Sequence, residues 1–139
     1  MKDNIAICPG SFDPITIGHL DIISRCSKMF GKVIVVVMVN ATKTPLFTGE
    51  ERVDMMRRSL TNLPNVQVDC YDGLLADYMR QVNGTAIVKG LRAVSDFEYE
   101  FQMALTNKKL CPEAETVFLT ADAQNMYLSS SVVKSVGSV

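Results

Sequence analysis

Residues 9–19, which read PGSFDPITIGH, connect a short apolar run to a longer apolar-periodic one. The preceding residues 5–8 are typical of a buried strand, and residues 18–30 have the spacing of a helix. Gly10 has no Cβ atom and lets the backbone approach a ligand closely. His19 falls at the start of the helix, where unpaired N–H groups and the positive end of the dipole attract phosphate. The stretch therefore predicts an anion site beside the only histidine of the chain.

Strands and helices are expected to alternate along the rest of the chain. Further strands are predicted over 32–40, 66–70, 85–88 and 116–119, and further helices over 48–60, 74–82, 95–110 and 132–136. Thr48 with Glu51, and Ser95 with Glu98, have the spacing of capping boxes. The alternation predicts one domain over residues 1–139 with an α/β fold. We expect a Rossmann-like, doubly wound, five-stranded parallel sheet with helices on both faces.

Particular side chains are expected to face the core. The mostly β-branched run at 33–39 suits a strand that is covered on both faces of a parallel sheet. Apolar residues at helical spacing are also predicted to pack inward; they are Leu20, Ile23, Met29, Phe30, Phe97, Phe101 and Leu105.

After the fourth predicted strand, residues 90–92 are expected to form a tight loop.

Composition excludes several classes of protein. The chain has 139 residues, of which 47% are hydrophobic and 21% charged, as expected of a single soluble globular domain. A formal net charge of -1 argues against nucleic-acid binding. The longest apolar run is too short to span a membrane, and the N-terminus does not resemble a signal peptide. Four cysteines without a Cys-x-x-Cys pair, and one histidine, make zinc binding improbable and indicate reduced thiols in a cytoplasmic protein.

Polar and cationic residues follow the predicted strands at one edge of the sheet. In doubly wound sheets, ligands bind beyond the carboxyl ends of the strands, where the strand order reverses. The first and fourth strands are expected to flank that point. Cations, hydroxyls and two helix N-termini at this edge suit a polyphosphate. No Walker-type lysine loop and no Gly-x-Gly-x-x-Gly pattern occurs, which argues against P-loop hydrolysis and dinucleotide-dependent hydride transfer.

Three segments carry a resemblance to a known family. Residues 11–19 (SFDPITIGH) resemble the Thr-x-Gly-His version of the nucleotidyltransferase signature. Residues 89–100 (KGLRAVSDFEYE) and 128–134 (LSSSVVK) resemble two further blocks of the bacterial phosphopantetheine adenylyltransferase family. The first block by itself specifies only the superfamily, whereas the second is specific for this family. The resemblance extends over essentially the whole chain.

The resemblance implies an activity and its surroundings. The enzymes of this family transfer the adenylyl group of ATP to 4′-phosphopantetheine, giving 3′-dephospho-coenzyme A and pyrophosphate in coenzyme A biosynthesis, with Mg²⁺. A cytoplasmic homohexamer built as a dimer of trimers is implied as well, with no nucleic-acid or membrane partner. Members of the family usually continue further, so the resemblance implies that a C-terminal helix is missing after Val139.

The resemblance also implies site residues. The catalytic residues would be His19, Lys43 and Arg92. The ATP-binding positions would be Ser11, Phe12, His19, Gly90, Leu91, Arg92, Glu100, Asn125, Met126, Tyr127, Leu128, Ser129, Ser130 and Ser131. The phosphopantetheine-binding positions would be Ser11, Lys43, Leu75 and Lys89, where many members have arginine in place of Lys89. No protein ligand to the metal is implied.

The chemistry of the substrate bears on the role of His19. A phosphate monoester has a second pKa near about 6, so it is largely a dianion at neutral pH and needs no general base. We therefore hypothesise that His19 donates a hydrogen bond to the α-phosphate. Two alternatives remain: a sister nucleotidyltransferase with another acceptor, whose signature typically has histidine at the position of Thr16, or an inactive or regulatory protein that binds ATP or coenzyme A.

Overall fold

The structure is a computed structural model, which describes residues 4–39, 45–91 and 94–120. It contains one five-stranded parallel sheet in the order β3-β2-β1-β4-β5. The strands are β1 (Ile5–Gly10), β2 (Lys32–Met38), β3 (Val66–Tyr71), β4 (Ala86–Leu91) and β5 (Glu115–Thr120). The helices are α1 (Ile17–Met29), α2 (Gly49–Ser59), α3 (Leu75–Val82) and α4 (Val94–Leu110). The predicted fold class is confirmed, and the helix predicted over 132–136 lies outside the described residues.

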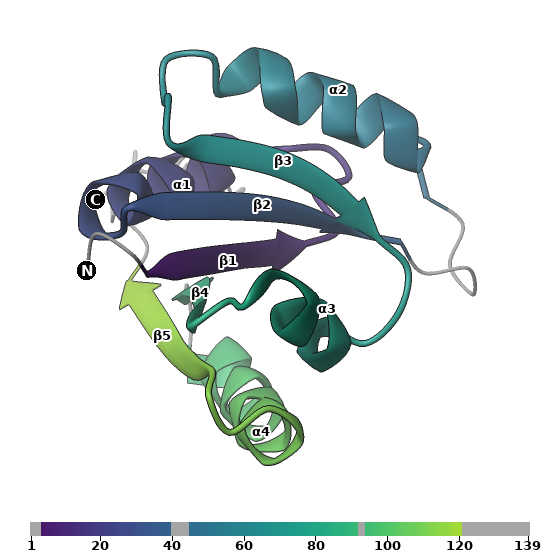
Figure 1. Cartoon of the computed structure of the whole chain (residues 1–139). Coiled ribbons are helices and arrows are strands. Elements are labelled where there is room, and N and C mark those ends of the chain that lie inside the picture. The colour runs from purple at the N-terminus through teal and green to yellow at the C-terminus, as the bar shows by residue number, and fades with distance from the viewer. Residues whose placement is uncertain (1–3, 40–44, 92–93, 121–139) are drawn as a thin grey trace, which may run out of the picture.

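The valine run of β2 shows how both faces of the sheet are covered. Val33, Val35 and Val37 pack into the cluster formed with α1 and α2, whereas Ile34 and Val36 pack into the cluster formed with α3. In Figure 1, α1 and α2 accordingly lie on one side of the sheet, and α3 and α4 on the other. Full burial of such a side chain stabilises the fold by about 1.5–3 kcal/mol. The prediction of a strand buried on both faces is confirmed.

The helix starts were predicted with mixed success. In α2, the Glu51 backbone N–H donates to Thr48 Oγ1 over 3.1 Å, and the Thr48 N–H donates to Glu51 Oε1 over 2.8 Å, which confirms that capping box. The helix α4 begins at Val94, so Ser95 lies within it, and the N-cap expected at Ser95 is wrong. The preference of serine for N-caps cannot by itself fix a boundary to one residue.

The strand β4 is longer than predicted. Residues Gly90 and Leu91 pair with Leu119 and Thr120 of β5, so the tight loop expected to begin at Gly90 is wrong. A Cβ atom at Gly90 would lie 2.9 Å from Ile22 Cγ1 of α1. The glycine thus marks a close approach of strand and helix.

The apolar residues expected in the core of α4 are exposed. Phe97, Phe101 and Leu105 have 43%, 44% and 51% of their surface exposed, and the prediction that they are core residues is wrong. Phe97 instead stacks on Phe101, with ring centroids 5.6 Å apart. Met29, also expected in the core, is 39% exposed, whereas Ile23 and Phe30 are buried and Leu20 is partly buried. Helical spacing shows which residues share a face, but it does not show what covers that face.

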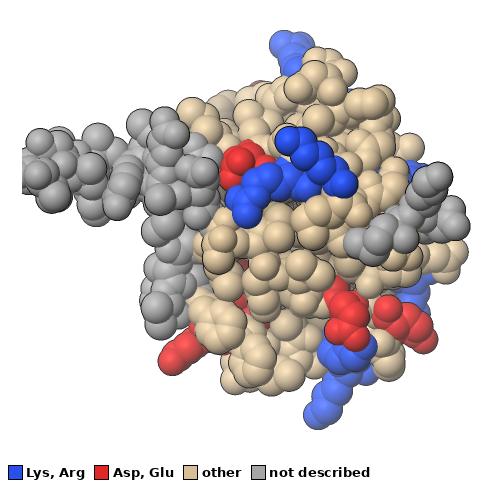
Figure 2. Space-filling model, turned by 90° about the vertical axis from the view of Figure 1, so that its left-hand side faces the viewer, with Lys and Arg blue, Asp and Glu red and all other residues tan. Residues whose placement is uncertain are grey.

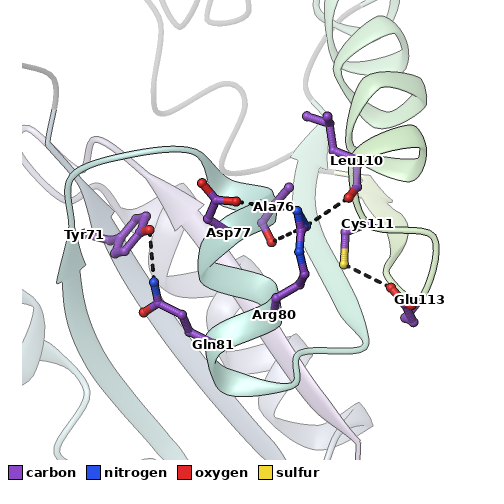
Figure 3. A network of polar contacts seen from close by, with 8 residues as sticks. All are labelled: Tyr71, Ala76, Asp77, Arg80, Gln81, Leu110, Cys111 and Glu113. Atoms are coloured by element: carbon purple, nitrogen blue, oxygen red, sulfur yellow. Dashed lines mark hydrogen bonds and ion pairs between the residues drawn. The ribbon is translucent and has the colours of Figure 1, made fainter.

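A polar network fastens α3 to the end of α4 (Figure 3). Arg80 donates to the carbonyl oxygens of Leu110 over 2.9 Å and of Ala76 over 3.4 Å, and it pairs with Asp77 at 3.5 Å. Nearby, the Cys111 thiol donates to Glu113, and a hydrogen bond from the backbone N–H of Glu113 together with that from Cys111 lowers the pKa of its carboxyl. The last carbonyls of α4 are thus partly satisfied from a neighbouring helix.

The charged side chains do not gather into a single basic surface on the side of the molecule shown in Figure 2. There, Lys and Arg side chains lie in separate groups, some of which have acidic side chains beside them. Among the described residues, no helix is long and apolar enough to cross a bilayer.

The end of α3 generates a stability prediction. Asn83 adopts the left-handed conformation, with φ 56° and ψ 42°, and the Gly84 N–H returns to Met79 O over 2.9 Å. Alanine in this conformation costs about 1 kcal/mol, because its Cβ approaches the following carbonyl. We expect Asn83→Ala to lower the free energy of unfolding in urea by about that amount, and Asn83→Gly to stay within about 0.5 kcal/mol of the parent. Equal values for the two variants would contradict the assignment of this cap.

Candidate active site

The carboxyl ends of β1 and β4 meet at one edge of the sheet. The strand β1 pairs with β2 on one side and with β4 on the other, so the strand order reverses between β1 and β4. Side chains that follow these two strands therefore lie at the crevice where doubly wound sheets bind ligands. This confirms that the first and fourth strands flank the reversal.

The turn after β1 brings Phe12 against His19. Phe12 is buried with φ 47°, a conformation that is rare for an aromatic residue, while Ser11 before it is exposed. The Phe12 and His19 rings meet edge to face, with centroids 4.9 Å apart. A Cβ atom at Gly10 would lie 2.9 Å from Phe12 Cζ, so the glycine makes room for this ring. Three of the predicted site residues therefore lie close together in sequence and structure: Ser11 and Phe12 in the turn after β1, and His19 in the first turn of α1.

Hydrogen bonds with Thr16 fix the imidazole of His19. Thr16 is the N-cap of α1: its hydroxyl accepts from the His19 N–H over 3.2 Å, and its own N–H donates to His19 Nδ1 over 3.0 Å. Because Nδ1 accepts, the neutral ring carries its proton on Nε2. The ring also lies in the first turn of α1, near the positive end of the helix dipole. Sequence reasoning missed this role of Thr16, since the usual capping box has Glu or Gln at the position of His19.

Two predicted site residues form an ion pair. Lys89 Nζ, at the end of β4, lies 2.6 Å from Glu100 Oε1 of α4, and both side chains are largely buried. The resemblance had assigned Lys89 to phosphopantetheine and Glu100 to ATP, and nothing in the sequence linked them. The carboxylate holds the ammonium group in a fixed place between β4 and α4.

The other predicted positions are distributed as follows. Gly90 and Leu91 complete β4, and Leu75 is the first residue of α3, partly buried against the cluster on that face. Lys43, Arg92 and residues 125–131 lie outside the described residues. Within the described ranges, no group of three or more His, Cys, Asp or Glu side chains could hold a metal ion.

Two buried thiols lie between β1 and α1. Cys8 of β1 and Cys26 of α1 are both buried, with their Sγ atoms 3.7 Å apart. The hydrogen bond to Cys26, together with burial, raises the pKa of the Cys8 thiol well above its usual value. Cys8 therefore stays protonated and packs as a small apolar side chain, without the thiolate character of a nucleophile.

Sequence reasoning missed two further residues near the turn, Asp13 and Arg52. The carboxylate of Asp13 accepts two backbone N–H bonds from the segment before α2. Arg52 is 4% exposed and belongs to the buried face of α2, together with Val53 and Met56. A charged residue on an apolar helix stripe is the signal that could have identified Arg52.

Comparisons with known proteins agree with this arrangement. The family model described as cytidylyltransferase-like matches residues 7–136. The chain is 59% identical to a phosphopantetheine adenylyltransferase of Dictyoglomus turgidum over 131 residues, which are 94% of this chain and 82% of that one. It is 60% identical to the phosphopantetheine adenylyltransferase of Clostridium kluyveri over 131 residues, 94% of this chain and 80% of that one.

Solved structures support the fold alone. A bifunctional NMN adenylyltransferase/ADP ribose pyrophosphatase from Francisella tularensis superposes with a TM-score of 0.65 at 19% identity, over 91% of this chain and 43% of that chain. A lipopolysaccharide core biosynthesis protein from Thermoplasma volcanium superposes with a TM-score of 0.60 at 18% identity, over 86% of this chain and 96% of that chain.

The contact between Gly10 and Phe12 generates a prediction. The methyl group of Gly10→Ala would overlap the Phe12 ring, and accommodating it should cost about 1–3 kcal/mol of folding free energy. Because the displaced ring faces His19, the proton resonances of this only histidine should shift in the NMR spectrum. In a Phe12→Leu background, where no ring occupies that space, the same substitution should cost less. An equal cost in both backgrounds would show that the ring is not the obstacle.

Proposed function

The chain belongs to the phosphopantetheine adenylyltransferases of the cytidylyltransferase-like family, and on this basis we propose how its residues carry out the reaction. It transfers the adenylyl group of ATP to 4′-phosphopantetheine, giving 3′-dephospho-coenzyme A and pyrophosphate, a step of coenzyme A biosynthesis. The observation that carries this conclusion is 59% identity over 94% of the chain. The alternative of a sister enzyme with another acceptor rests on fold likeness only.

The attacking group supplies its own charge. The terminal phosphate of 4′-phosphopantetheine is largely dianionic at neutral pH, because its second pKa is near about 6. One of its oxygens forms a bond to the α-phosphorus of ATP while the bond to the bridging oxygen of pyrophosphate breaks in line. The electron pair leaves with pyrophosphate, and no proton has to be removed from the nucleophile.

The imidazole of His19 suits a hydrogen-bond donor. With Nδ1 accepting from the Thr16 N–H, the proton of the neutral ring is on Nε2. We assign Nε2–H to a non-bridging oxygen of the α-phosphate, where negative charge grows in the transition state. The N-terminus of α1 would add its positive end to the same region.

The cations would hold the two substrates in line. Lys89, whose Nζ lies 2.6 Å from Glu100 Oε1, would bind the phosphate of 4′-phosphopantetheine. Lys43 would contact both this phosphate and the α-phosphate of ATP. Arg92 and the backbone of residues 129–131 would take up the charge of the leaving pyrophosphate. Ser11 and Phe12 would contact ATP, and Leu75 would line the phosphopantetheine side.

The proposed metal is Mg²⁺. This ion usually keeps several waters and binds through substrate phosphates with one or two carboxylates. We propose that oxygens of the triphosphate would be its main ligands. When bound, Mg²⁺ would neutralise charge on the β- and γ-phosphates.

The exposed side of α4 supports self-association. Large apolar side chains are exposed on this helix; they are Phe97, Tyr99, Phe101, Met103, Leu105 and Leu110. Helical spacing places Phe97, Phe101 and Leu105 on one stripe and the other three on another, and exposed apolar side chains of this size are typical of a protein interface. We therefore propose a homohexamer, a dimer of trimers, in which α4 is covered by neighbouring copies. A cytoplasmic location is proposed with it, since ATP is a co-substrate.

The function and the role of His19 are tested together. The chain should release pyrophosphate from ATP and Mg²⁺ only when 4′-phosphopantetheine is added. In His19→Ala, loss of one transition-state donor should lower kcat by about 10²–10³, with a much smaller change in KM. Circular dichroism should confirm that the variant is folded. Release without the acceptor would contradict the substrate, and unchanged kcat in the variant would contradict the role.

The assembly is tested by adding charge to α4. We expect Phe101→Glu and Leu105→Glu to shift the mass measured by light scattering from about six chains towards one, because a carboxylate cannot be buried unpaired at the interface. Met29→Glu places the same charge on an exposed apolar residue of α1 and should leave the mass unchanged. Intact hexamers in both α4 variants would show that this helix is not the interface.

A further inference from the structure

We infer that Asp13 and Arg52 are positioning residues of this reaction, which together hold the turn after β1 in the shape that presents Phe12 to His19. The inference rests on the proposed function, because it concerns the same site. The resemblance assigned no role to either residue: Asp13 lies within residues 11–19 but is not among the positions carried over, and Arg52 lies outside all three segments.

Asp13 joins its turn to a distant part of the chain. Its Oδ2 accepts from the Leu46 N–H over 2.7 Å and its Oδ1 accepts from the Phe47 N–H over 2.9 Å. The two bonds span 33 and 34 residues of sequence. Hydrogen bonds to an ionised carboxylate are about twice as strong as those between neutral groups. The segment that leads into α2 is therefore fastened to the turn by both oxygens of one side chain.

Arg52 makes the reciprocal connection. Its Nη1 donates to Ser11 O over 2.9 Å and its Nε donates to Thr48 O over 3.3 Å, although the residue is only 4% exposed. Burying a guanidinium group is costly unless it is hydrogen-bonded, and an apolar residue would pack on α2 at lower cost. Its location thus indicates a task that an apolar side chain cannot perform, namely holding the Ser11 carbonyl.

The two contacts hold Phe12 from both of its neighbours. The carbonyl of Ser11, just before Phe12, is bound by Arg52, and the side chain of Asp13, just after it, is bound by the segment before α2. Between them, Phe12 is kept at φ 47°, a backbone conformation that is strained for a residue other than glycine. Its ring lies 4.9 Å from that of His19. Losing either anchor lets Phe12 relax, which moves Ser11 and removes the support of the imidazole.

The test uses isosteric or charge-preserving variants. Asp13→Asn keeps the shape but can accept only one of the two N–H bonds, and Arg52→Lys keeps the charge but cannot span both carbonyls. Each should lower kcat/KM by about tenfold to 100-fold, because displacements of about 1 Å have effects of this size. The double variant should lose about as much as either single variant, since the two anchors act on one turn. The His19 resonances should shift in all three.

Asp54 and Arg58 provide the matched control. They form an exposed ion pair of 2.9 Å on the same helix, α2. Asp54→Asn and Arg58→Lys should keep kcat/KM within about twofold, because exposed pairs contribute little. All variants are assayed far below their melting temperatures, so that a loss of stability alone would leave kcat per folded molecule unchanged.

The outcomes separate the possibilities. Unchanged kcat/KM and His19 resonances in Asp13→Asn, or losses that multiply in the double variant, would overturn the positioning role. If Arg52→Lys does not fold, the kinetics and resonances of Asp13→Asn decide by the same criteria. If the parent chain does not release pyrophosphate with 4′-phosphopantetheine, the proposed function fails, whereas the His19 resonances still show whether Asp13 holds the turn.

Discussion

The pairing of β1 with a parallel strand on each side is the constraint on which the rest of the structure depends. It reverses the strand order between β1 and β4, so the chain leaves both strands at the same edge. The turn with Ser11 and Phe12 and the end of β4 with Lys89 therefore lie at the same edge of the sheet. The two core clusters hold this arrangement from opposite faces, and the loops of the site rest on a rigid sheet.

The sequence was most informative where local chemistry determines local structure. The apolar run at 33–39 can be buried along its whole length only as an inner strand of a sheet that is covered on both faces. The capping box of Thr48 and Glu51 depends on two residues that are only three positions apart. The parallel alternation then required Ser11, His19 and Lys89 to lie at one edge. These predictions succeeded because they depend on periodicity, on short spacing and on topology.

What could not be predicted depends on the relative orientation of distant elements. The pairing of Lys89 with Glu100 requires a particular orientation of α4 against β4, and Asp13 meets partners 33 and 34 residues further along the chain. The exposure of Phe101 on α4 has the same origin, because the pattern of a helix is identical whether its apolar face meets the sheet or another molecule. The capping box of Thr16 and His19 was not predicted, because an imidazole nitrogen takes the place that a Glu or Gln side chain usually has at the third position of the helix.

The close approach of β4 to α1 has a consequence for how this sequence can change over time. A side chain at position 90 would have its Cβ atom 2.9 Å from Ile22 Cγ1, so the two positions share one volume. An alanine at 90 becomes tolerable only after position 22 has become smaller, and a single step in the other order passes through a strained intermediate. Substitution histories of this enzyme should therefore show a residue larger than glycine at position 90 only where position 22 carries a side chain smaller than isoleucine.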